Sequence, residues 1–517
     1  MSKESIDKAE NFLAISSQYK LGSLITESPH PLTKNLSDLA KKNLPKAIDV
    51  LKELDDQTVN VLIDKKGEIF FLKKAIRETL QSGNNIYYCG CGATGRLSLT
   101  IETLWRQVHA NNDLKDRVFS FMSGGDVALI RSIENFEDFP AYGARQLHES
   151  GFKNGDLLIA TTEGGETPFV IGATEEASRV SHRNPFFLYC NPDNILSIVA
   201  ERSRIVIENK SIEKINLTVG PMAVTGSTRM QSSTILLAAA GVPLFYFNES
   251  DDSLGQAIDN FAEYWKKTDI RFIDKFIISE SDIYKAGEYL LYETDNKLGI
   301  TVITDTTERS PTFSLFPFEN ANEKDQNLSL CYLHLPGANN SQSAWESLLW
   351  RKPRTLEWPD INGIASKERL LGFDFSNSVV SRRVRLKKDI KQHSFKLFSV
   401  HDGIDISLDG EKFFISAPFT IPLFTHLALK MIMNTHSTLI MGRLGRYEGN
   451  VMTYVRASNN KLIDRAIRYI DMILKNRNIV MSYNELCHIL FEMIEITPVD
   501  SSIVLATVAE IERRKKN

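Results

Sequence analysis

The sequence contains few cysteines, and their placement argues against two common kinds of site. There are five in 517 residues, at positions 89, 91, 190, 331 and 487. Cys89 and Cys91 lie close together, but no second cysteine or histidine pair lies near them to complete a zinc site. An odd and scattered set does not form a disulfide framework either. We therefore predict no metal and no cofactor, and a reducing, cytoplasmic location.

The sequence also lacks a strong net charge and a long apolar run. Its formal net charge is −4, which implies no general attraction to nucleic acid or to a membrane surface. The longest apolar stretch, residues 234–247, is too short to span a bilayer and contains Gly241 and Pro243. The first residues, Met1-Ser-Lys-Glu-Ser5, are polar and do not resemble a signal peptide. We therefore expect neither a nucleic-acid nor a membrane partner.

What the first half does contain is an alternation of short apolar runs with amphipathic segments. This pattern predicts a mostly parallel sheet with helices on both faces. The predicted strands are 86–89, 117–122, 156–162, 185–190 and 204–208, and the predicted helices are 97–105, 126–137, 167–181 and 194–202. The polar turns at 90–95, 123–125 and 161–167 each follow a strand. We expect them to meet at one edge of the sheet, where such sheets bind ligands.

A second and weaker series follows a helical connector predicted at 250–275. Its predicted strands are 299–304, 328–335, 395–400 and 413–416, and the polar stretch 305–311 stands where a glycine-rich turn would be. Further helices are predicted at 38–43, 45–54, 68–80, 421–434, 460–476, 483–494 and 499–515. The basic run that ends the chain, Arg513-Arg-Lys-Lys516, suits a solvated helix end. A chain of 517 residues is expected to form more than one domain.

The stretch from Asn85 to Ser98 is the most informative part of the sequence. A buried strand is followed by Gly90, Gly92 and Gly95, which allow the backbone to approach a ligand closely, and then by a helix whose positive end faces the same point. The spacing fits a dinucleotide fingerprint formally, but no acidic residue follows where the ribose would need one. A monophosphate therefore fits better, and a tight turn without any ligand stays open as an alternative.

Three further stretches share this character. Ser123-Gly-Gly-Asp126 ends a strand and is followed by Glu134 and Glu137, which lie three residues apart and would share a helix face, although they could also form a solvated acidic surface. Ala160-Thr-Thr-Glu-Gly-Gly-Glu-Thr-Pro168 is a second potential phosphate cradle. Ser227 and Thr228 open a helix after Gly226. In these last two stretches the hydroxyls could instead cap helices.

The order and spacing of these four motifs resemble a sugar isomerase (SIS) domain. More closely, they are similar to the N-acetylmuramic acid 6-phosphate etherases and to the glucokinase regulatory proteins. The etherases continue directly into a segment that here appears displaced by about 195 residues, as Lys430-Met-Ile-Met-Asn434 and Met441-Gly-Arg-Leu-Gly-Arg446. That layout resembles the regulators, whose two tandem SIS domains look like a fused etherase dimer. It implies that residues 430–470 pack over the first site or its mirror image.

The resemblance implies a set of ligand-binding residues and one catalytic candidate. Hydroxyls of Thr94, Thr162, Ser227 and Thr228 are expected to bind the phosphate or nearby sugar hydroxyls, beside Gly92, Gly95 and Gly164 of the turns. Glu137 is expected to face the ligand as an acid or base. A second etherase glutamate should lie eight residues after Arg96, where this chain has Leu104. Glu102 lies on another side of the helix and does not simply replace it.

We therefore predict an α/β protein of two tandem SIS domains with a helical N-terminal arm and a helical C-terminal cap. The predicted ranges are 1–65 for the arm, 66–250 for the first SIS domain, 251–280 for a connector, 281–450 for a second, degenerate SIS domain and 451–517 for the cap. The expected function is binding of a hexose or amino-sugar 6-phosphate as in the glucokinase regulators, with a sugar kinase as possible partner. The alternative is an N-acetylmuramic acid 6-phosphate etherase or a sugar-phosphate isomerase.

Overall fold

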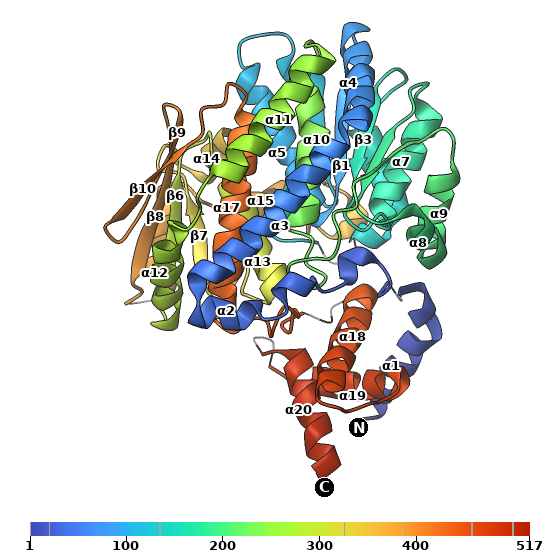
Figure 1. Cartoon of the computed structure of the whole chain (residues 1–517), viewed down its shortest axis with the longest axis vertical. Coiled ribbons are helices and arrows are strands. Elements are labelled where there is room, and N and C mark those ends of the chain that lie inside the picture. The colour runs from blue at the N-terminus through green and yellow to red at the C-terminus, as the bar shows by residue number, and fades with distance from the viewer. Residues whose placement is uncertain are drawn as a thin grey trace.

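The computed structural model describes residues 2–516 except 20, 134–135, 325, 388, 456, 458 and 499–500 (Figure 1). A first sheet is built from five parallel strands in the order β2-β1-β3-β4-β5. These strands are β1 Ile86–Gly90, β2 Val118–Met122, β3 Leu157–Thr161, β4 Phe186–Tyr189 and β5 Glu213–Asn216. The predicted parallel sheet is confirmed, and four of its strands lie where the sequence placed them.

The prediction of the fifth strand was wrong. Residues 204–208 belong to a helix, α9 Glu201–Glu208, and the edge strand follows it as β5. The run Arg204-Ile-Val-Ile-Glu208 is rich in β-branched residues, which favours a strand on local grounds. In the structure Val206 is fully buried while Ile205 is 47% exposed, so only one side of the segment faces the core. The prediction of a helix at 126–137 was also wrong, since the described residues of this stretch form the short 3₁₀ turns Asp126–Leu129 and Phe136–Asp138.

A second sheet lies in the later half of the chain, with the order β10-β9-β8-β6-β7. Its strands are β6 Tyr289–Thr294, β7 Cys331–His334, β8 Gln392–Val400, β9 Gly403–Leu408 and β10 Glu411–Ser416. The strand β6 pairs in parallel with β7 and β8, whereas β8, β9 and β10 form an antiparallel meander. Residues 299–304, predicted as a strand, begin the helix α13 Gly299–Phe313 instead. The stretch 305–311 is therefore part of that helix and not a turn.

Helices from both halves pack against one another between the two sheets. The helices α5 Gly92–Val108, α10 Gln231–Phe245, α13 and α17 Pro422–Arg443 contact each other in this layer, as Figure 1 shows around α10 and α17. Almost every side chain of α10 and α17 is buried. A helix that is buried on all sides belongs inside a protein. One continuous hydrophobic cluster therefore joins the two halves.

The two chain ends come together in a small helical lobe that projects from the body (Figure 1). It consists of α1 Lys3–Ile15, α18 Asn460–Asn476, α19 Tyr483–Ile496 and α20 Ile503–Lys516. The other helices of the chain are α2 Leu36–Lys42, α3 Leu44–Asp64, α4 Lys66–Gln81, α6 Pro140–Glu149, α7 Pro168–Val180, α8 Asp193–Val199, α11 Asp251–Lys267, α12 Ile273–Lys285, α14 Ser341–Leu349, α15 Lys367–Gly372 and α16 Ser378–Leu386.

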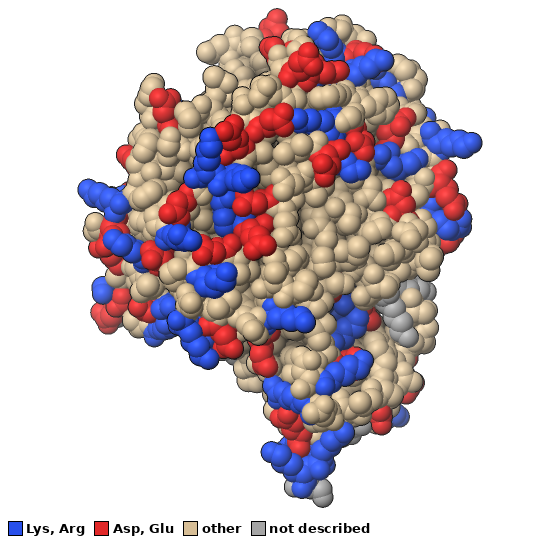
Figure 2. Space-filling model, in the orientation of Figure 1, with Lys and Arg blue, Asp and Glu red and all other residues tan. Residues whose placement is uncertain are grey.

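Charges of both signs are interspersed over the face shown in Figure 2, and basic residues gather at the tip where α20 ends. Among the described residues, no helix is long and apolar enough to cross a membrane.

A segment that follows α14, residues 350–366, crosses from the second sheet to the first. We call it the strap. Its backbone accepts a hydrogen bond at Arg354 from the amide of Asp126, and Trp358 stacks on Phe136 with ring centroids 5.5 Å apart. Leu356, Trp358, Ile361 and Ala365 of the strap join the apolar cluster of the first sheet. The two halves are therefore tied together outside the helical layer as well.

Candidate functional site

A cavity of about 240 Å³ lies at the carboxyl ends of β1 and β3. Its walls come from the loop before residue 30, the first turn of α5, the loops after β2, after β3 and before α10, the end of α13, and the start of α18 with the loop preceding it. The lining residues on which the argument depends are Glu27, Cys91, Gly92, Arg96, Glu137, Glu163, Gly164, Glu166, Ser227, Thr228, Arg229, Glu308, Lys461 and Arg465. Part of the segment predicted to pack over the first site thus lines the cavity, namely Met452, Val455, Asn459, Lys461, Leu462 and Arg465.

Five of the predicted site residues line the cavity, and three do not. Those that line it are Gly92, Glu137, Gly164, Ser227 and Thr228. The hydroxyl of Thr162 lies 3.0 Å from that of Thr167 and accepts a hydrogen bond from the Gly165 amide, so it organises the turn after β3. A side chain at Gly95 would meet the Cβ of Met122 at 2.5 Å, which shows that this glycine lets α5 pack closely on β2.

Thr94, the third of these, acts within the helix start. The helix α5 begins at Gly92 and not at Leu97 as predicted. Gly92 has a φ of 54°, in the left-handed region that glycine adopts without strain. The Thr94 hydroxyl accepts a hydrogen bond from the Cys91 amide at 3.0 Å and donates to the Cys91 carbonyl at 2.9 Å. A contact of Thr94, Gly95 or Thr162 with a ligand stays a prediction.

Of the five glutamates that line the cavity, Glu137, Glu163 and Glu308 come from three different elements. Glu137 accepts a hydrogen bond from the Cys91 thiol at 3.0 Å. Burial, together with the neighbouring Glu308 carboxyl, raises the pKa of Glu163 to about 7. Glu308 comes from α13 and is 4% exposed; burial also raises its pKa, although Arg96 and Arg229 act in the opposite direction. One of its oxygens, Oε2, has no hydrogen-bond partner. The cavity therefore holds a carboxyl, that of Glu163, that can exchange a proton near neutral pH.

Glu308 adds a further carboxyl to the cavity wall, whereas neither Leu104 nor Glu102 lines it. Leu104 is fully buried in the core, and Glu102 is held in an ionic cluster away from the cavity. Burial alone would raise the pKa of Glu102, but Arg351 and Arg354 of the strap outweigh it and hold that pKa far below its ordinary value. Its oxygens accept hydrogen bonds from both arginines and from Ser120. Glu134, the other alternative, lies outside the described residues.

The cavity also contains cationic groups, and several of them are already paired. Lys461 and Arg202 pair with Glu166, and the two cations lower the pKa of that buried carboxyl to about 2 in spite of its burial. Arg465 and Arg468 of α18 pair with the buried Glu27. These ion pairs attach the helical lobe to the body at the rim of the site. Arg96 is 2% exposed and donates from Nε to the Leu129 carbonyl at 3.2 Å.

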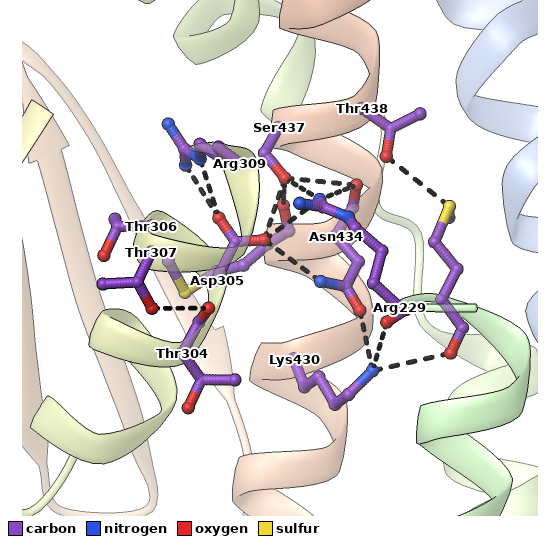
Figure 3. A network of polar contacts seen from close by, with 12 residues as sticks. Arg229, Thr304, Asp305, Thr306, Thr307, Arg309, Lys430, Asn434, Ser437 and Thr438 are labelled. Carbon is purple, nitrogen blue, oxygen red and sulfur yellow. Dashed lines mark hydrogen bonds and ion pairs between the residues drawn. The ribbon is translucent and has the colours of Figure 1, made fainter. Parts of the chain in front are cut away.

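Arg229 differs because two of its nitrogen atoms remain unpaired. It is 3% exposed, and neither its Nε nor its Nη1 has a hydrogen-bond partner. Its Nη2 donates to Asp305 at 3.3 Å and to Ser437, in the network that Figure 3 shows. A buried guanidinium with free donors, beside the Ser227 and Thr228 hydroxyls and the positive end of α5, is suited to an anion with several oxygens.

The network behind Arg229 joins the two displaced family segments (Figure 3). Lys430 of α17 donates to the Arg229 carbonyl at 3.0 Å, to Thr234 at 2.8 Å and to Asn434 at 2.8 Å. Asp305 accepts from Asn434 at 3.0 Å and from Arg309 at 2.8 Å. Burial lowers the pKa of Lys430 to about 8. Residues about 200 positions apart thus fix the backbone and guanidinium of Arg229.

Sequence reasoning did not single out Glu163, Glu308, Arg229 or Lys461. Glu163 lies between Thr162 and Gly164 in a turn that the sequence predicts to be a possible phosphate site, so its position could have been recognised from the sequence. The signal for Glu308 was hidden because its stretch was interpreted as a turn of a separate, degenerate site.

Comparison with known proteins is in agreement with this arrangement. Residues 71–177 match the family model described as the glucokinase regulatory protein N-terminal SIS domain. The N-acetylmuramic acid 6-phosphate etherase of Aliivibrio fischeri (strain MJ11) is 30% identical over 217 residues, which cover 41% of this chain and 66% of the etherase. The etherase of Vibrio campbellii (strain ATCC BAA-1116) is 28% identical over 295 residues, covering 56% of this chain and 88% of the etherase.

Among solved structures, tagatose-6-phosphate ketose/aldose isomerase from Escherichia coli is 10% identical and covers 82% of this chain and 97% of its own, with a TM-score of 0.41. The chain resembles the N-terminal SIS domain of the glucokinase regulators over residues 71–177 and the etherases over a longer segment. The matched segment spans slightly less than two thirds of the Aliivibrio fischeri etherase.

Proposed function

We propose that this chain binds an amino-sugar 6-phosphate in the cavity and cleaves an ether substituent from it, as the etherases it resembles are named for doing. The observation that carries the proposal is the pair Glu163 and Glu308. Both line the same cavity, and burial raises the pKa of both, that of Glu163 to about 7, so each is suited to take up or give a proton. The doubt raised by Leu104 does not apply, because the second half supplies the further carboxyl.

The polar end of the cavity positions the phosphate. Ser227, Thr228, Arg229 and Gly92 of the first turn of α5 line the same cavity. These groups are charge-assisted donors for phosphate oxygens. Thr228 also donates a hydrogen bond to Glu163, which places that carboxyl next to the phosphate end.

The carboxyls then perform the proton transfers. In the open-chain sugar, one carboxylate removes the proton beside the carbonyl, and a protonated carboxyl gives a proton to the leaving ether oxygen. The carbon–oxygen bond breaks, which leaves an unsaturated sugar and the free hydroxy acid. Water adds to the double bond, with the first proton returned to the sugar. The net reaction consumes one water and changes no oxidation state.

Lactate release from N-acetylmuramic acid 6-phosphate tests this proposal. We expect turnover by the wild-type chain and a loss of about 10²–10⁴-fold in Glu308→Gln or Glu163→Gln, the usual contribution of one general acid or base. Glu368→Gln on the exposed side of α15 is the matched control and should retain activity. Absence of turnover in the wild-type chain, with the sugar phosphate bound, would contradict the etherase activity.

A second candidate function is regulation of a sugar kinase in response to a sugar phosphate. It is favoured by the family match at residues 71–177 and by the presence of two sheets in one chain. In that case the protein binds the ligand without releasing lactate. A purified sugar kinase should then bind the chain with an affinity that changes when the sugar phosphate is added.

A further inference from the structure

A second cavity of about 540 Å³ opens beside the first, and the proposed function makes no use of it. We call it the side cavity. The two cavities share Ser132, Pro311 and Leu462 as lining residues, so these three residues form a common wall between them. The remaining wall comes from the loop after β2, the chain after α13, and the end of the strap with α15. Each half of the protein thus contributes to it.

The walls of the side cavity combine apolar groups with two guanidinium groups. Ile130, Ile133, Pro317 and Ile364 provide apolar surface, and Arg131 and Arg369 provide the charges. Glu323 pairs with both arginines, at 2.8 Å from Arg131 and 3.3 Å from Arg369. Among the residues that the structure describes, one carboxylate therefore pairs with two cations at this wall.

Burial and mutual repulsion destabilise the charged forms of the two arginines, and a bound anion would reduce this destabilisation. Burial lowers the pKa of Arg369, and the Arg131 guanidinium lowers it further while Glu323 acts against both. The Nε of Arg131 is buried and has no hydrogen-bond partner. Two like charges that lie close together and are partly removed from water destabilise one another. An opposite charge placed between them reduces this effect. A bound carboxylate would supply that charge and accept the free N–H.

We infer that the ligand of this site is a sugar phosphate whose ether substituent is extended by a short peptide, with the peptide chain in the side cavity and its terminal carboxylate on Arg131 and Arg369. This inference rests on the proposed function and names its substrate class. The first cavity has room and charge for the phosphorylated sugar. The larger side cavity has the apolar wall and the cationic end that a peptide with a free carboxylate requires.

Binding measurements on three ligands test the inference. The ligands are N-acetylglucosamine 6-phosphate, N-acetylmuramic acid 6-phosphate, and the latter carrying an L-alanyl-D-isoglutamine dipeptide on its lactyl group. Calorimetry in the Glu308→Gln background prevents turnover. We expect the dipeptide ligand to bind about tenfold or more tightly than N-acetylmuramic acid 6-phosphate, the gain expected from one good hydrogen bond to a charged group.

Variants of the two arginines test whether they cause the gain in affinity of the dipeptide ligand. In Arg131→Gln combined with Arg369→Gln, the dipeptide ligand should lose its advantage while N-acetylglucosamine 6-phosphate binds as before, which also shows that the variant is folded. Lys367→Gln removes an exposed positive charge nearby and should change nothing. Equal affinity of the wild-type site for both lactyl ligands would overturn the inference, as would an equal loss for all three ligands. If N-acetylglucosamine 6-phosphate itself does not bind, the proposed function fails as well.

Discussion

At the scale of single residues, Thr94 and Ser227 look alike in the sequence but act differently in the structure. The sequence predicts both hydroxyls at a helix start in a glycine-rich turn, but α10 begins only at Gln231, after Ser227. Thr94 is 1% exposed and its hydroxyl is hydrogen-bonded to the Cys91 backbone, whereas Ser227 lines the cavity. A hydroxyl beside a helix end can cap it or bind a ligand, and only the direction of the side chain distinguishes the two.

We expect Thr94→Val to lower the free energy of unfolding by about 1 kcal/mol, the usual cost of a lost cap. Sugar-phosphate affinity should fall less than in Ser227→Ala. Urea unfolding and calorimetry on both variants measure this. Thr100→Val is the matched control, because that hydroxyl donates only to the Arg96 carbonyl of the same helix. Unchanged stability with a large loss of affinity would instead make Thr94 a ligand contact.

Glu163 should make the stability of the protein depend on pH. Its pKa is raised from 4.5 to about 7 in the folded chain, mainly by burial. Between these values the folded state holds a proton that the unfolded state has released, so the free energy of unfolding decreases as pH rises. Glu163→Gln should remove that decrease between pH 5 and pH 7.5, measured by urea unfolding without ligand. A variant that keeps the full wild-type slope would show that another group is responsible.

At the scale of elements, the sequence predicted most of what local patterns encode. Residues 460–476 were predicted as a helix and form α18 with the same bounds, because Asn459 caps it and the apolar side chains recur at helical spacing. The strands β1 to β4 are short apolar runs bounded by turn residues. The predictions failed at α9 and α13, because these helices also contain short apolar runs that look like strands in the sequence. In α13, Ile300, Val302 and Ile303 are all buried, and a helix buried on every side has no periodicity to reveal it.

The packing of α5 on β2 can be tested through Gly95. An added Cβ would lie 2.5 Å from that of Met122, so the helix would have to move away from the strand. We expect Gly95→Ala to cost about 1–3 kcal/mol of unfolding free energy, as overpacking does. Gly67→Ala in α4 is the control, since nothing lies within 4 Å of its added Cβ and alanine favours a helix. If both variants unfold alike in urea, α5 does not pack against β2 at this distance.

At the scale of the whole molecule, the site exists only because the two halves of the chain meet. The tandem architecture and the lining of the cavity by part of residues 452–465 could be anticipated from the displaced family segment. The position of Glu308 could not, because it depends on how α13 packs on α5 across more than 200 residues of sequence. No local pattern carries that information. The domain boundaries at 250 and 280 stay a prediction, and the strap shows that residues 350–366 pack on the first sheet.

A fragment containing only residues 1–247 tests this dependence. It keeps the first sheet and the hydroxyls of the phosphate end, but it lacks Glu308, Lys461 and the network that holds Arg229. The helix α10 would also lose α17 from one side, and α10 has no polar face to turn toward water. We therefore expect the fragment to aggregate or to leave N-acetylglucosamine 6-phosphate unbound. Co-expression of residues 248–517 should restore binding, because the interface between the halves is a continuous hydrophobic core of the kind that permanent complexes bury. A soluble fragment that binds the ligand as tightly as the whole chain would mean that the second half contributes nothing to the phosphate site.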